Sequence, residues 1–271
     1  MVVNVCLVGR VLAHQRHEVI VGEVRRRGAA RVRDLASLLG VSDMTVRRDL
    51  DVLGDAGLVT KVHGGATTPH HPGSFEPGFA AKSVRNVDDK AAIARAAAAR
   101  VSPGAAIGLG AGTTTYQLAI ELEAVADLTI VTNSIRVAEV LSQRPRPDRT
   151  VVVTGGVRTP SDALVGPIAV QSLRSVHLDV VFMGVHGMSA DAGFTTPNLD
   201  EADTNRVFIA ATPRLVVLAD HTKWAITGLS SFATLGEADA VITDQGLPSS
   251  GRDILGEQVG ELVLAPTLRS P

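Results

Sequence analysis

Beyond about Ala80 the sequence alternates short apolar runs with stretches of helical periodicity, and this alternation restricts the fold more than any other feature. Strands that alternate with helices form a doubly wound, mostly parallel α/β sheet with right-handed crossovers. Strands are expected at 105–109, 128–132, 150–154, 179–183, 215–219 and 240–243. Helices are expected at 87–101, 114–123, 134–142, 163–175 and 200–211. Aromatic residues make up only 3% of the chain, so the core must be aliphatic, as in strands that are buried on both faces.

The preceding segment is purely helical at first. Apolar periodicity predicts helices at 14–27, 32–39 and 43–56, and Ser42 is a suitable N-cap for the third. Val46, Leu50 and Leu53 stand at i, i+4 and i+7 and should form one buried stripe. A strand is expected at 58–62, and a turn at 63–66 leads into a second strand. This order of elements is that of a winged helix-turn-helix.

The chain of 271 residues is long enough for two domains. Residues 67–80 are rich in Pro and Gly and are expected to be a linker. We therefore expect an N-terminal extension at 1–13, a winged helix-turn-helix at 14–66 and a larger α/β domain at 81–271.

Charge and cysteine content limit the cellular setting. The whole chain has a net charge of -2, whereas residues 14–68 hold nine basic and seven acidic side chains, which is weakly basic and consistent with a nucleic-acid contact. Cys6 is the only cysteine, so no disulfide can form within the chain, which favours a reducing compartment. The apolar start lacks the features of a signal peptide, and no apolar run is long enough for a membrane span. A cytoplasmic location is expected.

The third helix is the candidate for reading DNA. Its face opposite the apolar stripe is polar and free to enter a major groove. Thr45 and Arg48 are candidates for base edges, and Arg47 for a base or a phosphate. Ser42 and the helix N-terminus suit a phosphate oxygen, and Lys61 and His63 of the wing would reach the neighbouring backbone or minor groove. The alternative is that the arginines form solvated ion pairs with acids three or four residues away.

Polar loops follow the expected strands of the larger domain. Gly110 and Gly112 would let the backbone approach a ligand, and Thr113 and Thr114 open a helix whose N-terminus favours an anion. Further loops contain Asn133, Gly155-Gly156, Gly184–Gly187 and Asp220–Lys223. Because ligands of open α/β sheets bind at the carboxyl ends of the strands, these loops should meet at one edge, where Glu201 and Lys223 could complete a site for a polyol and a phosphate. The alternatives are a helix cap without ligand, an acid stabilised by a helix dipole and a solvated lysine.

Residues 32–53, together with Gly57-Leu58-Val59 and Lys61–Ala66, resemble the N-terminal signature of the DeoR family of bacterial transcriptional regulators. The larger domain is similar to the sensor domain of that family in its Gly-Thr-Thr loop, Val131–Ser134, Gly155-Gly156, Ala163–Gly166, Phe182–Gly187, Glu201-Ala202 and Asp220–Lys223, so the resemblance spans about residues 14–245. It implies that residues 42–53 are the recognition helix and 61–66 the wing.

The resemblance also implies a fold like that of ribose-phosphate isomerases and a sugar-phosphate effector. The effector residues of the family correspond to Gly112, Thr113, Thr114, Asn133, Gly187, Glu201 and Lys223, and the basic residues ahead of the first sensor strand to Lys82, Arg85 and Lys90. The chain departs from the pattern at Gly110, where members often have an acidic residue that would accept a hydrogen bond from a hydroxyl group.

The expected function is that of a sequence-specific repressor of sugar-metabolism genes, bound as a dimer or higher oligomer to operator DNA and controlled by a phosphorylated sugar. No cofactor, metal or catalytic residue is expected. The main alternative is a sugar-phosphate isomerase with a DNA-binding head, which needs a positioned general base such as Asp179, Glu201 or Asp220. A third class is an architectural DNA-binding protein with an oligomerising body.

Overall fold

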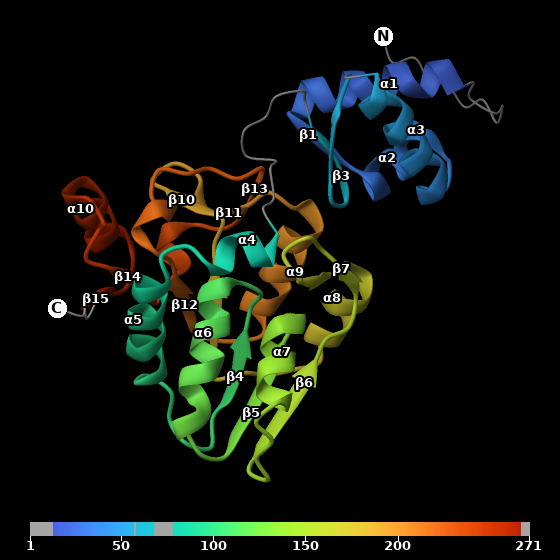
Figure 1. Cartoon of the computed structure of the whole chain (residues 1–271). Helices are drawn as coiled ribbons and strands as arrows, with labels where there is room; N and C mark the ends of the chain where they lie inside the picture. Colours follow the sequence, from blue (N-terminus) through green and yellow to red (C-terminus); the bar gives the residue numbers. More distant parts are fainter. Residues whose placement is uncertain (1–12, 57, 68–77, 267–271) are drawn as a thin grey trace. The chain divides into compact units, whose positions relative to one another are not determined.

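A computed structural model describes residues 13–56, 58–67 and 78–266 (Figure 1). The chain divides into two compact units between Ser74 and Phe75. Residues 1–12 of the expected N-terminal extension and 68–77 of the expected linker lie outside the described residues. Of the remaining linker positions, Thr67 ends a strand, Gly78 is the N-cap of a helix, and Phe79 and Ala80 begin that helix.

The described residues of the first unit form three helices and a small antiparallel sheet with the strand order β1-β3-β2. The elements are α1 (Ala13–Arg27), β1 (Ala29–Arg31), α2 (Val32–Leu39), α3 (Asp43–Asp55), β2 (Thr60–Val62) and β3 (Gly65–Thr67). The expected stripe is confirmed, because Val46, Leu50 and Leu53 are at most 2% exposed within the core of this unit. The strand β1 was not expected; it pairs with β3 from Ala29↔Thr67 to Arg31↔Gly65.

The second unit is built on a seven-stranded parallel sheet, which confirms the expected fold class. The strand order is β15-β14-β12-β9-β4-β5-β6. In chain order the strands are β4 (Ala106–Leu109), β5 (Leu128–Thr132), β6 (Arg149–Val153), β9 (Val180–Gly184), β12 (Leu215–Leu218), β14 (Ala240–Asp244) and β15 (Leu262–Ala265). Six of these strands were expected, and β15 was not.

Helices cover both faces of this sheet (Figure 1). Side chains of β9 show the alternation: Val180 and Phe182 belong to one buried cluster, and Val181 and Met183 to the other. The first cluster lies under α5 (Val87–Ala98), α6 (Thr113–Glu121) and α7 (Ile135–Ser142). The second lies under α8 (Pro167–Leu173), α9 (Leu199–Ala210) and α10 (Ser249–Gln258). Short helices are α4 (Phe79–Ser83), η2 (Leu122–Ala124), η3 (His221–Lys223) and η4 (Leu235–Glu237).

Two smaller sheets complete the second unit. One has the order β10-β11-β13, with β10 (Gly187–Ser189), β11 (Gly193–Thr196) and β13 (Ser230–Ala233). The other pairs β7 (Val157–Arg158) with β8 (Leu164–Val165). The helix expected at 163–175 is therefore too long: β8 occupies its start, and α8 begins at Pro167, because proline suits the first turn of a helix, where the N–H groups lack partners in any case.

The order of the strands creates a switch point between β4 and β9. From β4 the chain moves outward through β5 and β6, returns to β9 on the other side of β4, and continues outward through β12, β14 and β15. The loops after β4 and β9 therefore lead away in opposite directions and leave a crevice at the carboxyl edge of the sheet. Among the described residues, no helix is long and apolar enough to cross a membrane.

Candidate functional site

The outward face of α3 is available in the first unit. Arg47 and Arg48 are exposed, and Met44 is 62% exposed. Ser42 is the N-cap, as expected: its hydroxyl accepts a hydrogen bond from the Thr45 backbone N–H at 3.2 Å and lies 3.0 Å from the Thr45 hydroxyl. Thr45 is half-buried and hydrogen-bonded to its cap, so the two arginines are the long cationic side chains that this face presents.

The wing is joined to α3 by an ion pair. The Lys61 ammonium on β2 donates a hydrogen bond to the Asp51 carboxylate, and both side chains are about half exposed. His63, in the turn between β2 and β3, is half-buried. A phosphate that approached Lys61 would therefore compete with the Asp51 carboxylate.

A charged cluster that sequence reasoning missed fixes the inner side of α3. Asp49 is only 5% exposed, and its carboxylate receives two hydrogen bonds from the Arg16 guanidinium of α1, at 2.8 and 2.9 Å. The His17 ring lies 3.1 Å from the same carboxylate. The Arg16 hydrogen bonds are the main reason that the pKa of Asp49 is lowered. The only signal in the sequence is an acid placed between Val46 and Leu50, inside the stripe that faces the core.

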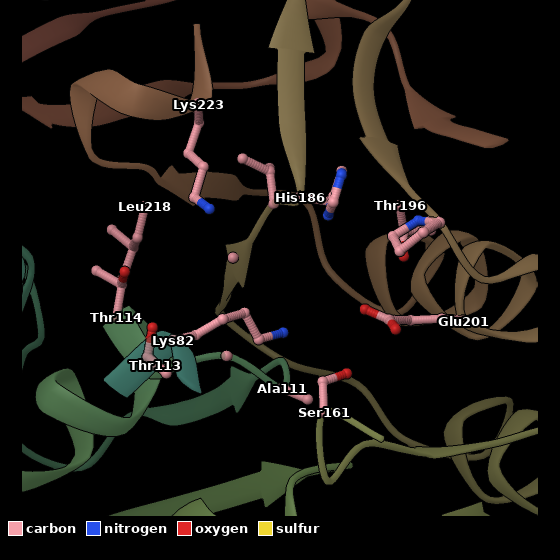
Figure 2. A pocket seen from close by; sticks show the side chains of 14 residues that line it. Lys82, Ala111, Thr113, Thr114, Ser161, His186, Thr196, Glu201, Leu218 and Lys223 are labelled. Carbon is pink, nitrogen blue, oxygen red and sulfur yellow. The ribbon is translucent and has the colours of Figure 1, made fainter. Parts of the chain in front are cut away.

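The second unit has a pocket at the switch point of its sheet (Figure 2). Its recess has a volume of about 590 Å³, part of it open to solvent. The loop after β4 contributes Ala111, Gly112, Thr113 and Thr114, and the end of β9 with its loop contributes Gly184, Val185 and His186. The remaining lining residues are Lys82, Ser161, Thr196, Pro197, Glu201, Leu218 and Lys223.

Cationic and hydroxyl groups gather on one side of this pocket. In Figure 2 the Lys223 side chain and the hydroxyls of Thr113 and Thr114 lie on the same side, and the Lys82 side chain reaches toward the centre. Thr113 and Thr114 form the first turn of α6, where backbone N–H groups without helical partners and the helix dipole favour a negative charge. Lys223 on the side of this helix N-terminus, together with Lys82 near the centre, suits a phosphate group.

The opposite side of the pocket offers a carboxylate. Glu201 stands in the first turn of α9, its backbone N–H donating to the Asn198 side chain at 3.0 Å, and its carboxylate points toward the cavity (Figure 2). Burial, together with the charges of Lys223 and Lys82, lowers the pKa of His186 to about 4, so its ring is neutral at pH 7. A carboxylate and a neutral imidazole can bind hydroxyl groups of a ligand whose phosphate lies at the other end.

The structure brings six of the expected effector residues to this pocket: Lys82, Gly112, Thr113, Thr114, Glu201 and Lys223. Sequence reasoning missed Ser161, Thr196 and His186, although the Gly184–Gly187 loop after a predicted strand pointed to His186.

Four expected effector residues do not line the pocket. Arg85 is exposed beyond α4. Asn133 is fully buried, and its side-chain amide donates to the Leu164 carbonyl at 3.2 Å, which joins β5 to β8. A Cβ atom on Gly187 would lie 2.1 Å from the Ile226 carbonyl oxygen, so this glycine allows two backbone segments to approach. A Cβ atom on Gly110 would lie 2.6 Å from Met183 Sδ, so Met183 fills the space that an acidic side chain would need.

Lys90 stabilises the segment that carries the pocket residue Lys82. It is 4% exposed, and its ammonium donates to the Lys82 carbonyl at 2.7 Å and to the Arg85 carbonyl, just beyond the end of α4. Burial lowers the pKa of Lys90, and the nearby Asp220 carboxylate opposes that shift. Lys90 therefore holds the segment that carries Lys82 and does not itself line the cavity.

Asp89, His221 and Asp244 place one potential metal-ligand atom each within 4.8 Å of one another. Asp244 is already engaged: one oxygen accepts from the Gly246 N–H at 2.8 Å and lies 2.8 Å from His221 Nδ1, and the other accepts from the His221 backbone N–H at 2.7 Å. This cluster links the loop after β12 to the end of β14. Both oxygens of the Asp244 carboxylate already have hydrogen-bond partners within the protein.

Comparison with known proteins agrees with both units. Residues 16–71 match the model of the DeoR-like helix-turn-helix domain, and residues 85–245 match that of the DeoR C-terminal sensor domain. The chain is 34% identical to the HTH-type transcriptional regulator GlpR of Haloferax volcanii, over 90% of this chain and 94% of that protein. It is 30% identical to the HTH-type transcriptional repressor CsqR of Escherichia coli K12, over 92% and 94%. It is 34% identical to the lactose phosphotransferase system repressor of Staphylococcus aureus, over 85% and 92%.

Among solved structures, ribose 5-phosphate isomerase A of Methanocaldococcus jannaschii matches 52% of this chain and 55% of its own, with 18% identity and a TM-score of 0.37. The helix-turn-helix unit and the sensor unit together define a DNA-binding transcriptional regulator. The chain belongs to the DeoR family of such regulators.

Proposed function

We propose that this protein is a cytoplasmic repressor of sugar-metabolism genes whose hold on operator DNA is controlled by a phosphorylated sugar in the pocket of the second unit. The observation that carries the proposal is the division of that pocket. Lys223 and the start of α6 place positive charge and donors at one side, Lys82 reaches toward the centre, and Glu201 offers an acceptor at the other side. A ligand with a phosphate at one end and hydroxyl groups at the other matches this division.

Similarity to other regulators supports repression. One relative is named as a repressor of a lactose phosphotransferase system and another as a transcriptional repressor. Arg47 and Arg48 on the exposed face of α3 would contact bases or phosphates, with Ser42 and Thr45 at the start of the helix and Lys61 and His63 on the wing. Binding as a dimer or higher oligomer would place two such helices on a repeated site.

The site is proposed to bind without turnover. An isomerase needs a base whose pKa is matched to its working pH. His186, with a pKa of about 4, is neutral at pH 7, where it would be a weak base. Glu201 is the remaining candidate, so isomerisation of ribose 5-phosphate by the purified protein is the assay that would favour the enzyme.

Trp224 makes the proposal straightforward to test, because it is the only tryptophan of the chain and follows the pocket residue Lys223. Its emission is titrated with ribose 5-phosphate, fructose 6-phosphate, glucose 6-phosphate and glycerol 3-phosphate, with the unphosphorylated sugars and inorganic phosphate as controls. Genomic fragments that the protein retains are then used in gel shifts with and without the best ligand. We expect a phosphorylated sugar to bind and to change operator affinity; a ligand that binds and leaves operator affinity unchanged would contradict the proposal.

A further inference from the structure

The short helix α4 has an unusual position in the chain. It is the first described element after β3, so it continues directly into the segment that joins the two units, and it carries Lys82 into the pocket. None of its five residues is buried. Its position therefore depends on a few identifiable contacts and not on a packed core.

The ring of Phe79 makes two of these contacts. It packs edge-to-face on Tyr116 of α6, with ring centroids 5.4 Å apart and an interplanar angle of 76°. The guanidinium carbon of Arg136, on α7, lies 5.5 Å from the centroid of the same ring. Both are favourable arrangements for an aromatic ring, and they hold the start of α4 against two helices of the sensor unit.

The loop 159–162 holds the backbone of the same residue and lines the pocket. The Phe79 N–H donates to the Pro160 carbonyl at 3.4 Å, and the next residue, Ser161, lines the cavity. Asp162 is 3% exposed and accepts a hydrogen bond from Arg136 Nε at 2.6 Å. A single network thus joins the pocket wall, Arg136 and the Phe79 ring.

We propose that α4 couples the pocket to the DNA-binding unit, and that Phe79 and Arg136 are the positioning residues that make this coupling work. The inference rests on the proposed function, in which a phosphorylated sugar binds Lys82. A ligand changes an equilibrium only by its difference in affinity for the two states. Lys82 is part of α4, so a ligand that binds its ammonium favours one position of α4, the first described element of the second unit.

The test compares two arginines that share one acid. Arg136 and Arg158 both donate to Asp162, at 2.6 and 2.7 Å, but the close ring contact with Phe79 involves Arg136. Arg136→Gln removes the cation beside the ring, and Arg158→Gln is the matched control. Phe79→Leu removes the ring and keeps an apolar side chain, and Phe79→Tyr restores the ring. All are studied in the full chain, with Trp224 emission for ligand affinity and gel shifts for operator affinity.

In the wild-type protein we expect the sugar phosphate selected by titration to change operator affinity by about tenfold, within the usual range of allosteric coupling. In Phe79→Leu and Arg136→Gln this factor should fall below about threefold, while operator affinity without ligand stays close to wild type. The ligand Kd measured with Trp224 should rise modestly, because Lys82 is less well positioned while Lys223 and the start of α6 are unchanged. Phe79→Tyr and Arg158→Gln should keep the wild-type factor.

Two results would overturn the inference: full coupling in Phe79→Leu, or equal loss of coupling in Arg136→Gln and Arg158→Gln. Failure of the proposed function gives a different result. In that case the wild-type protein itself binds none of the sugar phosphates, or its operator affinity does not change when a ligand binds. In that case the role of α4 is refuted together with the function on which it rests.

Discussion

Replacing Asp49 by alanine should destabilise the DNA-binding unit strongly. The side chains of Asp49 and Arg16 are only 8% and 15% exposed, so the variant leaves a guanidinium largely buried without its carboxylate. Removal of one partner from a buried ion pair costs about 3–5 kcal/mol. Because Arg16 retains some access to water, we expect about 2–3 kcal/mol for Asp49→Ala. In a domain of this size that corresponds to a fall of roughly 10–20 °C in Tm.

The measurement must report on the first unit, whereas the single tryptophan and the single tyrosine, Trp224 and Tyr116, both belong to the second. Hydrogen exchange of the α3 amides in the full chain gives the local free energy of unfolding, and Trp224 emission checks that the second unit is unchanged. The control is Asp51→Ala, which removes a half-exposed ion pair with Lys61 and should cost less than about 1 kcal/mol.

The pH dependence of Asp49 has a defined sign. The pKa of Asp49 is lowered in the folded protein, mainly by the Arg16 hydrogen bonds. The stabilisation that Asp49 gives the first unit is therefore complete above the ordinary carboxyl pKa of about 4. It is lost as the pH falls through the lowered pKa. A double-mutant cycle with Arg16→Met should give a coupling energy of at least about 1 kcal/mol. The reasoning is refuted if Asp49→Ala lowers the free energy of unfolding no more than Asp51→Ala does. It is also refuted if the cycle shows no coupling between Asp49 and Arg16.

Three further variants test the two sites. Arg48→Ala should weaken operator binding by about 1–3 kcal/mol and relax one base preference in gel shifts with substituted operators, whereas the exposed Arg33→Ala on α2 should not. Lys223→Met should weaken sugar-phosphate binding by about 10- to 100-fold, from the loss of one charge-assisted hydrogen bond, without changing operator binding in the absence of ligand; equal losses for the phosphorylated and plain sugars would contradict a phosphate contact. Burial and the two pocket lysines lower the pKa of His186 to about 4, whereas an unfolded histidine titrates near 6.5, so the stability of the second unit should fall by up to about 3 kcal/mol between pH 6.5 and 4. Denaturant unfolding followed with Trp224 should show a flatter profile in His186→Asn, and an unchanged slope would mean that the ring is not desolvated.

Periodicity predicted the parts of the fold that bury a continuous apolar face. Val46, Leu50 and Leu53 identified the inner side of α3, and alternating apolar runs identified six of the seven sheet strands. It failed for short elements such as β1 and β8, which have three and two residues, because pairing partners and not local pattern define them. The helix α4 was missed for a related reason, since five residues give too short a window for a helical period.

Site residues on loops after strands were easier to predict than those held by distant partners. Thr113, Thr114 and Lys223 follow strands whose carboxyl ends meet, and the structure places them in one pocket. The role of Asp49 depends on Arg16, which lies 33 residues away, and no local pattern contains that information. Asn133 follows a predicted strand just as the other loop residues do, but its side-chain amide donates a hydrogen bond to Leu164 of β8 and does not line the pocket.

The packing of Met183 against Gly110 constrains how this pocket can change its ligand during evolution or design. The thioether sulfur lies where the first side-chain carbon of any other residue at position 110 would be, within 2.6 Å. Substituting aspartate at position 110 alone would therefore force the Met183 thioether to move before the carboxylate could accept a hydrogen bond from a hydroxyl group. Because Met183 is buried, a smaller residue at position 183 would make room for that acceptor more easily than displacement of the thioether, so we expect the two positions to vary together.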